Sequence, residues 1–81
     1  MVRMDGAEAR KQRYAQIAQK IQAMLYENKD QGFIPLKKTV VFFKVELGLT
    51  AEKIMECLND LAALDQFEID TEHDQIKKLR V

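Results

Sequence analysis

The sequence predicts a mainly α-helical domain that ends in a small β-hairpin, and three observations support this fold class. Residues 7–29 carry apolar side chains at three- and four-residue steps, the spacing of one helical face. The stretch VELGLTAEKIMECLNDLAAL combines a glycine turn, a threonine cap and a second amphipathic helix pattern. The tail FEIDTEHDQIKKLRV holds two short runs that suit strands on either side of polar turn residues.

The length and composition predict one small globular domain. The chain has 81 residues, of which 47% are hydrophobic and 32% are charged. Thirteen basic residues balance thirteen acidic ones, so electrostatic recognition has to come from local segregation of charge. We expect residues 1–6 to be a disordered N-terminal segment and residues 7–81 to form the domain.

The cysteine content and the apolar runs predict a cytoplasmic protein that does not bind membranes. A single cysteine, Cys57, cannot form an internal disulfide, which favours a reducing compartment. The first residues, MVRMDGAEARKQR, lack the apolar core of a signal peptide. The longest apolar run, Val40 to Phe43, is far shorter than the roughly 20 residues that span a bilayer.

The first helix is expected from about Ala7 to Lys29. Its apolar face consists of Tyr14, Ile17, Ala18, Ile21, Met24 and Leu25. The turn residues from Asn28 to Gly32 end it. At 1.5 Å per residue this helix is about 35 Å long, more than a small three-helix core can cover. Its first two turns are therefore expected to project or to pack on another chain.

The second helix is expected from Pro35 to Leu47, after an extended connector at Phe33–Pro35. The β-branched and aromatic run from Thr39 to Val45 would suit a strand by composition alone. A helix is predicted nevertheless, because apolar residues recur at three- and four-residue steps, at Leu36, Val40, Phe43 and Leu47. Gly48 is expected to end this helix in the left-handed conformation.

The third helix is expected to begin at the capping residue Thr50 and to end near Leu64 or Asp65. Its buried side is predicted to comprise Ala51, Ile54, Met55, Leu58, Leu61 and Ala62. Cys57 lies at the edge of that side and is interpreted as a small core residue.

The tail is predicted to be a two-stranded hairpin with a loop from about Glu72 to Ile76. In the expected register, Ile69 faces Leu79 and Phe67 faces Val81 on the core side. The same register pairs Glu68 with Arg80 and Asp70 with Lys78 on the outside. A slip of one residue would break both sets.

The order of these elements, and the residues FFKVELGLTAEKIMECLNDLAALDQFEID, resemble the winged helix-turn-helix family. The matching features are the aliphatic–glycine–aliphatic–threonine turn, the leucines Leu58 and Leu61, and the first strand of the wing. Asp65 and Gln66 stand where the family often has glycine. The resemblance implies a winged helix of three helices and a C-terminal two-stranded wing, here with an extended first helix. It also implies binding of double-stranded DNA, with the third helix in the major groove.

The charge pattern conflicts with DNA reading by the third helix. Its outward face holds Glu52, Glu56 and Asp60 beside the single base Lys53. From Leu49 to Asp70 one lysine stands against six acidic residues, a local charge of −5. Such a face would repel phosphates, whereas DNA-binding surfaces gain affinity by releasing counterions.

Two interpretations of function therefore remain open. The first is a small non-catalytic DNA-binding protein, a transcriptional or nucleoid regulator that dimerises through its first helix and contacts mainly the DNA backbone. Its candidate DNA-contacting residues are Arg10, Lys11, Arg13, Lys37, Lys38, Lys53, Lys78 and Arg80. The alternative is a protein-interaction winged helix in a larger assembly, which docks through Glu52, Glu56 and Asp60.

Other features of the sequence argue against catalysis and cofactors. His73 is the only histidine and lies in the predicted hairpin tip, where nothing holds it for acid–base chemistry. One histidine and one cysteine cannot make a zinc site, so no metal or cofactor is expected.

Val41, Phe42 and Val45 lie partly off the main apolar stripe of the second helix. We expect core burial for most of them, with a subunit interface as the alternative for one or two.

Overall fold

The computed structural model describes residues 6–79, and residues 1–5 and 80–81 lie outside the described part. The elements are α1 (Gly6–Glu27), β1 (Phe33–Pro35), α2 (Leu36–Leu47), α3 (Ala51–Ala63), β2 (Glu68–Asp70) and β3 (Gln75–Lys77). The strands form one antiparallel sheet in the order β1-β3-β2. The mainly helical class with a small hairpin is confirmed, but the sheet has a third strand that the sequence did not predict.

Residues 1–6 were predicted to be a disordered segment. Residues 1–5 lie outside the described residues, whereas Gly6 is the first residue of α1. Within residues 6–79, no helix combines the length and the apolar character that crossing a bilayer requires.

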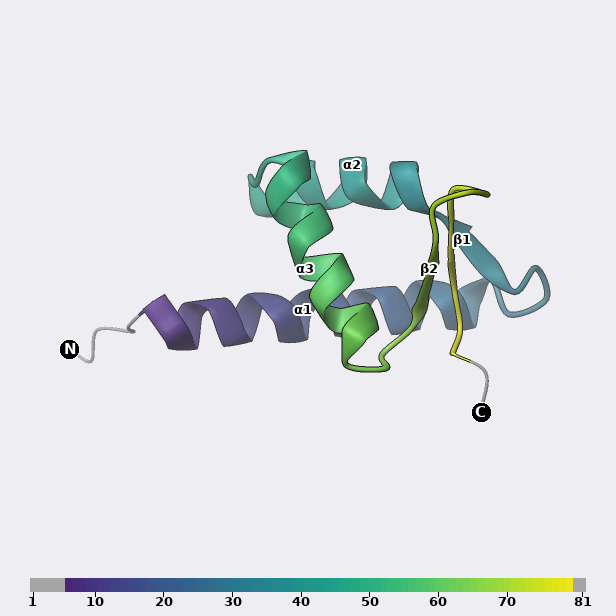
Figure 1. Ribbon diagram of the computed structural model, residues 1–81, viewed down its shortest axis with the longest axis horizontal. Coiled ribbons are helices and arrows are strands. Elements are labelled where there is room, and N and C mark those ends of the chain that lie inside the picture. Colours follow the sequence, from purple (N-terminus) through teal and green to yellow (C-terminus); the bar gives the residue numbers. More distant parts are fainter. Residues whose placement is uncertain (1–5, 80–81) are drawn as a thin grey trace.

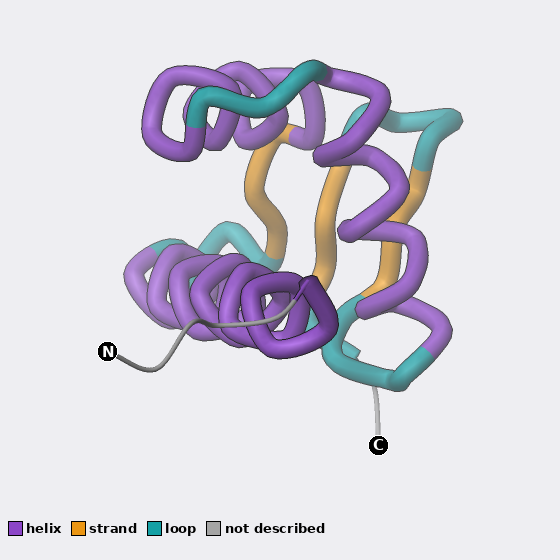
Figure 2. Tube along the Cα trace, turned by 90° about the vertical axis from the view of Figure 1, so that its left-hand side faces the viewer, coloured by secondary structure: helices purple, strands orange, loops and turns teal. Residues whose placement is uncertain are grey.

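Helices α1 and α2 are connected by α3 and, at one end, by the sheet (Figure 1). In Figure 1, α1 and α2 run along the two long sides of the molecule, α3 crosses between them, and the strands connect them at one end. Figure 2 shows the same arrangement from the side, with the sheet behind α3 and spanning from α1 to α2. The core fills the enclosed space; its largest fully buried side chains are Phe67, Ile17, Ile21, Ile34, Ile54, Leu58, Ile76 and Thr39.

The first helix projects beyond this core, as its length predicted. Ile17, Ile21 and Leu25 are buried, whereas residues 9–12 are all exposed. Figure 1 shows the beginning of α1 extending past α3 at the end of the molecule opposite to the sheet. The apolar stripe therefore starts two turns inside the helix, where the first core contacts become available.

Local signals set the ends of α2 and α3 as predicted. Gly48 adopts a left-handed φ of 66° and donates its N–H to the carbonyl of Lys44, a conformation that glycine tolerates without a steric cost. Thr50 then accepts the N–H of Lys53 on its side-chain oxygen at 3.2 Å and caps α3. Within α2, the buried Thr39 donates its hydroxyl to the carbonyl of Pro35 at 2.7 Å, so its polar group is satisfied.

The buried face of α3 differs slightly from the predicted one. Ile54, Leu58 and Leu61 are buried as expected, and Cys57 is only 5% exposed, which confirms it as a core residue. Ala51 was predicted to be buried and is exposed. It lies in the first turn of α3, at the surface-facing start of the helix.

The segment Phe33–Pro35 was predicted to be a connector and is a strand. Its register with β3 pairs Phe33 with Lys77, Ile34 with Ile76 and Pro35 with Gln75. Three residues are too few to show a strand period in the sequence. The pairing with β3 makes this segment a strand, and that partner lies about forty residues further along the chain.

The predicted hairpin register is wrong. The observed register pairs Glu68 with Lys77, Ile69 with Ile76 and Asp70 with Gln75. Consequently Ile69 and Asp70 do not pair with Leu79 and Lys78, and Glu68 pairs with Lys77. The other two expected partners, Arg80 for Glu68 and Val81 for Phe67, lie outside the described residues. The predicted loop from Glu72 to Ile76 is too long, because Ile76 is fully buried in β3.

A four-residue turn, Thr71–Asp74, sets the register. Asp70 accepts the backbone N–H of His73 on Oδ1 at 3.1 Å, which closes the turn. Asp74 has a φ of 55°, a conformation that aspartate tolerates better than most residues. Ile34, Ile76 and Ile69 thereby form one row across the three strands.

The hairpin tip also caps α2. Pro35 occupies the N-cap position and offers no side-chain cap. The carbonyl of Asp74 accepts the N–H of Leu36 at 2.9 Å, and its Oδ1 accepts the N–H of Lys37 at 3.0 Å. A residue of the tail therefore satisfies two of the N–H groups that the start of a helix leaves free.

The register predicts unequal costs of truncating two tail residues. Ile76→Ala should lower the free energy of unfolding by about 2–5 kcal/mol, because it opens a cavity in the core. Leu79→Ala should cost clearly less, because Leu79 is only partly buried. Urea unfolding followed by circular dichroism measures both. A larger loss for Leu79→Ala would contradict the observed register and favour the one expected from the sequence.

Candidate functional site

The exposed face of α3 carries three acidic side chains. Glu52, Glu56 and Asp60 follow each other at four-residue steps, and all three are exposed. The one base beside them, Lys53, lies with Nζ 3.6 Å from Oε2 of Glu56. Leu64 is the next residue at the same spacing and is 69% exposed. We call Glu52, Glu56, Asp60 and Leu64 the α3 stripe.

Asp60 also holds α1 against α3. The hydroxyl of Tyr14 donates a hydrogen bond to Oδ2 of Asp60 at 2.6 Å. This bond, with a smaller contribution from burial, raises the pKa of Tyr14 from 10.0 to about 12. Tyr14 was predicted as part of the apolar face of α1, and its ring does pack against the core. Its bond to Asp60 was not foreseeable, because 46 residues separate the two.

The candidate DNA-contacting residues are spread over separate parts of the surface. Arg10, Lys11 and Arg13 lie in the first half of α1, Lys37 and Lys38 at the start of α2, Lys53 on α3 and Lys78 after β3; Arg80 lies outside the described residues. In Figure 1 the first half of α1 and the start of α2 are at opposite ends of the molecule. The seven of these bases that the structure describes therefore do not form one continuous patch.

The outer face of α2 is both basic and apolar. Val41 and Val45 are 51% and 81% exposed, and Lys37, Lys38 and Lys44 are exposed on the same helix. The expectation of core burial is therefore wrong for these two valines, while Phe42 is half-buried against the core. A helix packed on one side only leaves its opposite side in solvent, whichever residues occupy it.

In the hairpin, Asp70 contacts two other polar side chains, His73 and Lys77. Asp70 Oδ2 lies 3.2 Å from Lys77 Nζ and 2.8 Å from His73 Nδ1. The hydrogen bond from His73 is the main cause that lowers the pKa of Asp70 from 3.8 to about 2. Asp70, Glu72 and His73 offer three potential metal-ligand atoms within 4.8 Å of one another. Because the Lys77 ammonium already neutralises Asp70, we interpret this group as the framework of the turn.

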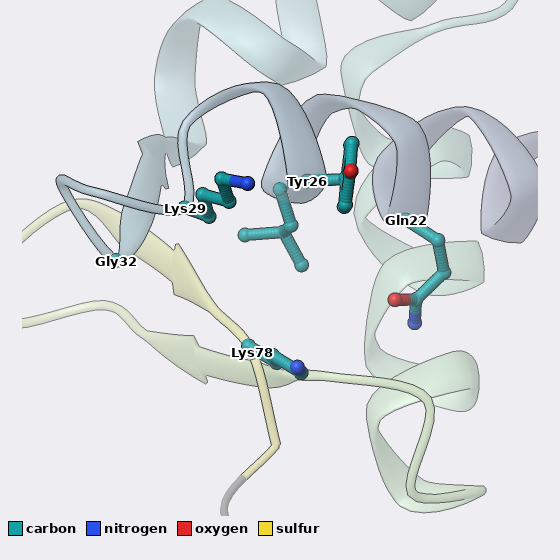
Figure 3. A pocket seen from close by; sticks show the side chains of 6 residues that line it. Gln22, Tyr26, Lys29, Gly32 and Lys78 are labelled. Atoms are coloured by element: carbon teal, nitrogen blue, oxygen red, sulfur yellow. The ribbon is translucent and has the colours of Figure 1, made fainter.

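A pocket that the sequence did not indicate lies between the end of α1 and the end of β3 (Figure 3). It is lined by Gln22, Leu25, Tyr26, Lys29, Gly32 and Lys78. Of these, only Lys78 was among the predicted site residues. The pattern gave no signal for the others, because the pocket joins two segments that lie far apart in the chain.

The Tyr14–Asp60 bond predicts a high tyrosine pKa. The chain has two tyrosines, so Tyr26→Phe leaves Tyr14 as the only one. Its ionisation, followed by the ultraviolet absorbance of tyrosinate, should have a midpoint near pH 12. The bond favours the neutral phenol, so its contribution to stability is complete below pH 10 and lost as the pH rises toward 12.

Asp60→Ala in the same background should move that midpoint toward 10.0, because it removes the hydrogen-bond acceptor. Circular dichroism at each pH checks that the protein remains folded. Equal midpoints with and without Asp60→Ala would contradict the assignment of the shift to this bond.

Comparisons with known proteins found no match to this chain among family models, curated proteins or solved structures. Its function has to be inferred from the geometry of its own surfaces.

Proposed function

We propose that the chain is a non-catalytic winged-helix module that docks on a basic surface of a protein partner through the α3 stripe. The winged-helix assignment is supported by the order of elements, since three helices are followed by a hairpin that packs against them. The short extended segment before α2 joins that hairpin as an additional strand.

The observation that carries the docking proposal is the composition of the exposed face of α3. In a winged helix that reads DNA, this face enters the major groove, where closely spaced phosphates require positive charge. Here it presents three exposed carboxylates, and its one lysine lies beside one of them. A basic protein surface is the partner whose charge complements such a face.

Leu64 gives the stripe an apolar contact at one end. Exposed ion pairs contribute only about 0–1 kcal/mol each, so charge alone would give a weak complex. The centre of a protein interface is usually apolar and its rim polar. A partner that covers Leu64 and places bases opposite Glu56 and Asp60 would supply both the apolar contact and the complementary charges.

Charge reversal on the stripe tests this proposal. Glu52→Lys/Glu56→Lys should abolish the retention of specific partner proteins by the immobilised chain, measured by quantitative mass spectrometry of a lysate from the source organism. The matched control is Glu27→Lys/Glu46→Lys, which changes the net charge equally at two exposed positions outside the stripe. Circular dichroism verifies that both variants are folded. Equal retention by the two variants would contradict the proposal.

The second candidate function is DNA binding through α2. It is favoured by Lys37, Lys38 and Lys44, which are exposed and form no ion pair within residues 6–79. In that case wild-type protein should bind a random duplex in fluorescence anisotropy, with an affinity that falls steeply between about 50 and about 200 mM salt. Lys37→Ala/Lys38→Ala should then reduce the salt dependence, whereas Glu52→Lys/Glu56→Lys should strengthen binding. No binding at micromolar protein in low salt would remove this candidate.

A further inference from the structure

The pocket between α1 and β3 has the size and lining of a small-molecule site. Its volume is about 360 Å³, and most of its lining is apolar. Ligand pockets commonly measure about 300–1,000 Å³ and combine an apolar lining with a few polar groups. Leu25 belongs to the core and Tyr26 is 71% exposed, so one wall is rigid and the other carries an uncovered aromatic ring.

The charge of the lining selects an anion. Lys29 and Lys78 both line the pocket, and none of the lining residues is acidic. Figure 3 shows the two lysine side chains on different sides of the pocket, one from the turn after α1 and one from the segment after β3. Neither lysine has an acidic partner among the described residues. The pocket therefore offers two ammonium groups and no carboxylate to a bound ligand.

The aromatic wall selects a planar group. Lys29 Nζ lies 5.0 Å from the centre of the Tyr26 ring, within the range of a cation–π contact. This contact places the ammonium group beside the tyrosine ring that lines the pocket. A flat ring can stack on the tyrosine while its charged substituent reaches the lysines. Gln22 donates its side-chain amide to the carbonyl of Gln66, which links the same wall to the loop after α3.

From this combination we propose that the pocket binds a small planar anion, an aromatic or heteroaromatic ring that carries a carboxylate or phosphate. The ring lies against Leu25 and Tyr26, and the anionic group lies between Lys29 and Lys78. Such a ligand joins the end of α1 to the end of β3. This site is independent of the α3 stripe, and its existence does not depend on the docking proposal.

Binding can be measured with 2-naphthoate as the probe. For a ligand of this size, a weak dissociation constant of about 1 mM is expected. The amide resonance of Gly32 in nitrogen–proton correlation spectra should shift with probe concentration. Lys29→Gln/Lys78→Gln should weaken binding by about 10-fold, since each exposed ion pair contributes up to about a factor of five.

Three controls distinguish this site from unspecific attraction. Lys37→Gln/Lys38→Gln removes the same charge elsewhere and should leave the dissociation constant unchanged. Neutral 2-naphthamide and inorganic phosphate should each bind at least several-fold more weakly than 2-naphthoate. The proposal is overturned if the probe does not shift Gly32, if both lysine pairs affect binding equally, or if naphthamide or phosphate binds as well as naphthoate.

Discussion

Asp74 joins the C-terminal hairpin to the start of α2, and the arrangement of the sheet depends on this contact. Its carbonyl and its carboxylate accept the N–H groups of Leu36 and Lys37. Pro35, the residue before α2, has no side-chain acceptor for these N–H groups. A carboxylate at a helix N-terminus also interacts favourably with the helix dipole. The contact holds β3 beside β1, and this position places Ile76 in the centre of the core.

This use of the hairpin determines which surfaces are available to partners. Asp74 is committed to α2, and Asp70 is committed to Lys77 and His73. The tip is therefore acidic in composition, but the carboxylates of Asp70 and Asp74 already have partners within the protein. On α2 and α3, the exposed surfaces are the basic, apolar face of α2 and the α3 stripe. Their opposite charges explain how a chain with no net charge can still offer strongly charged binding surfaces.

The helices were predictable from the sequence because their signals are local. Gly48 and Thr50 define a turn within three residues, and the apolar spacing of α1 and α3 identifies their buried sides. The sheet was not predictable to the same degree. A strand of three residues has no measurable period, and Lys77 and Lys78 are equally plausible partners for Asp70 when only charge is considered. The four-residue turn, which depends on hydrogen bonds to Asp70, selects Lys77.

The candidate site also has features that the sequence predicts locally and features that depend on packing. The sign of the charge on α3 follows directly from the helical spacing of Glu52, Glu56 and Asp60, and all three are exposed. The bond between Tyr14 and Asp60 and the pocket beside Lys29 join segments that are distant in the chain. No periodic pattern records such contacts, because they depend on how the elements are packed.

The contact between the hairpin and α2 is tested most directly by comparing two glycine substitutions in the same turn. Asp74→Gly removes the carboxylate and tolerates the positive φ at this position, while Glu72→Gly adds equal freedom to the unfolded chain. Asp74→Gly should cost about 1 kcal/mol more in the free energy of unfolding and should speed hydrogen exchange at the Lys37 amide. Equal stability of the two variants, with Lys37 exchanging at the wild-type rate in both, would contradict the account.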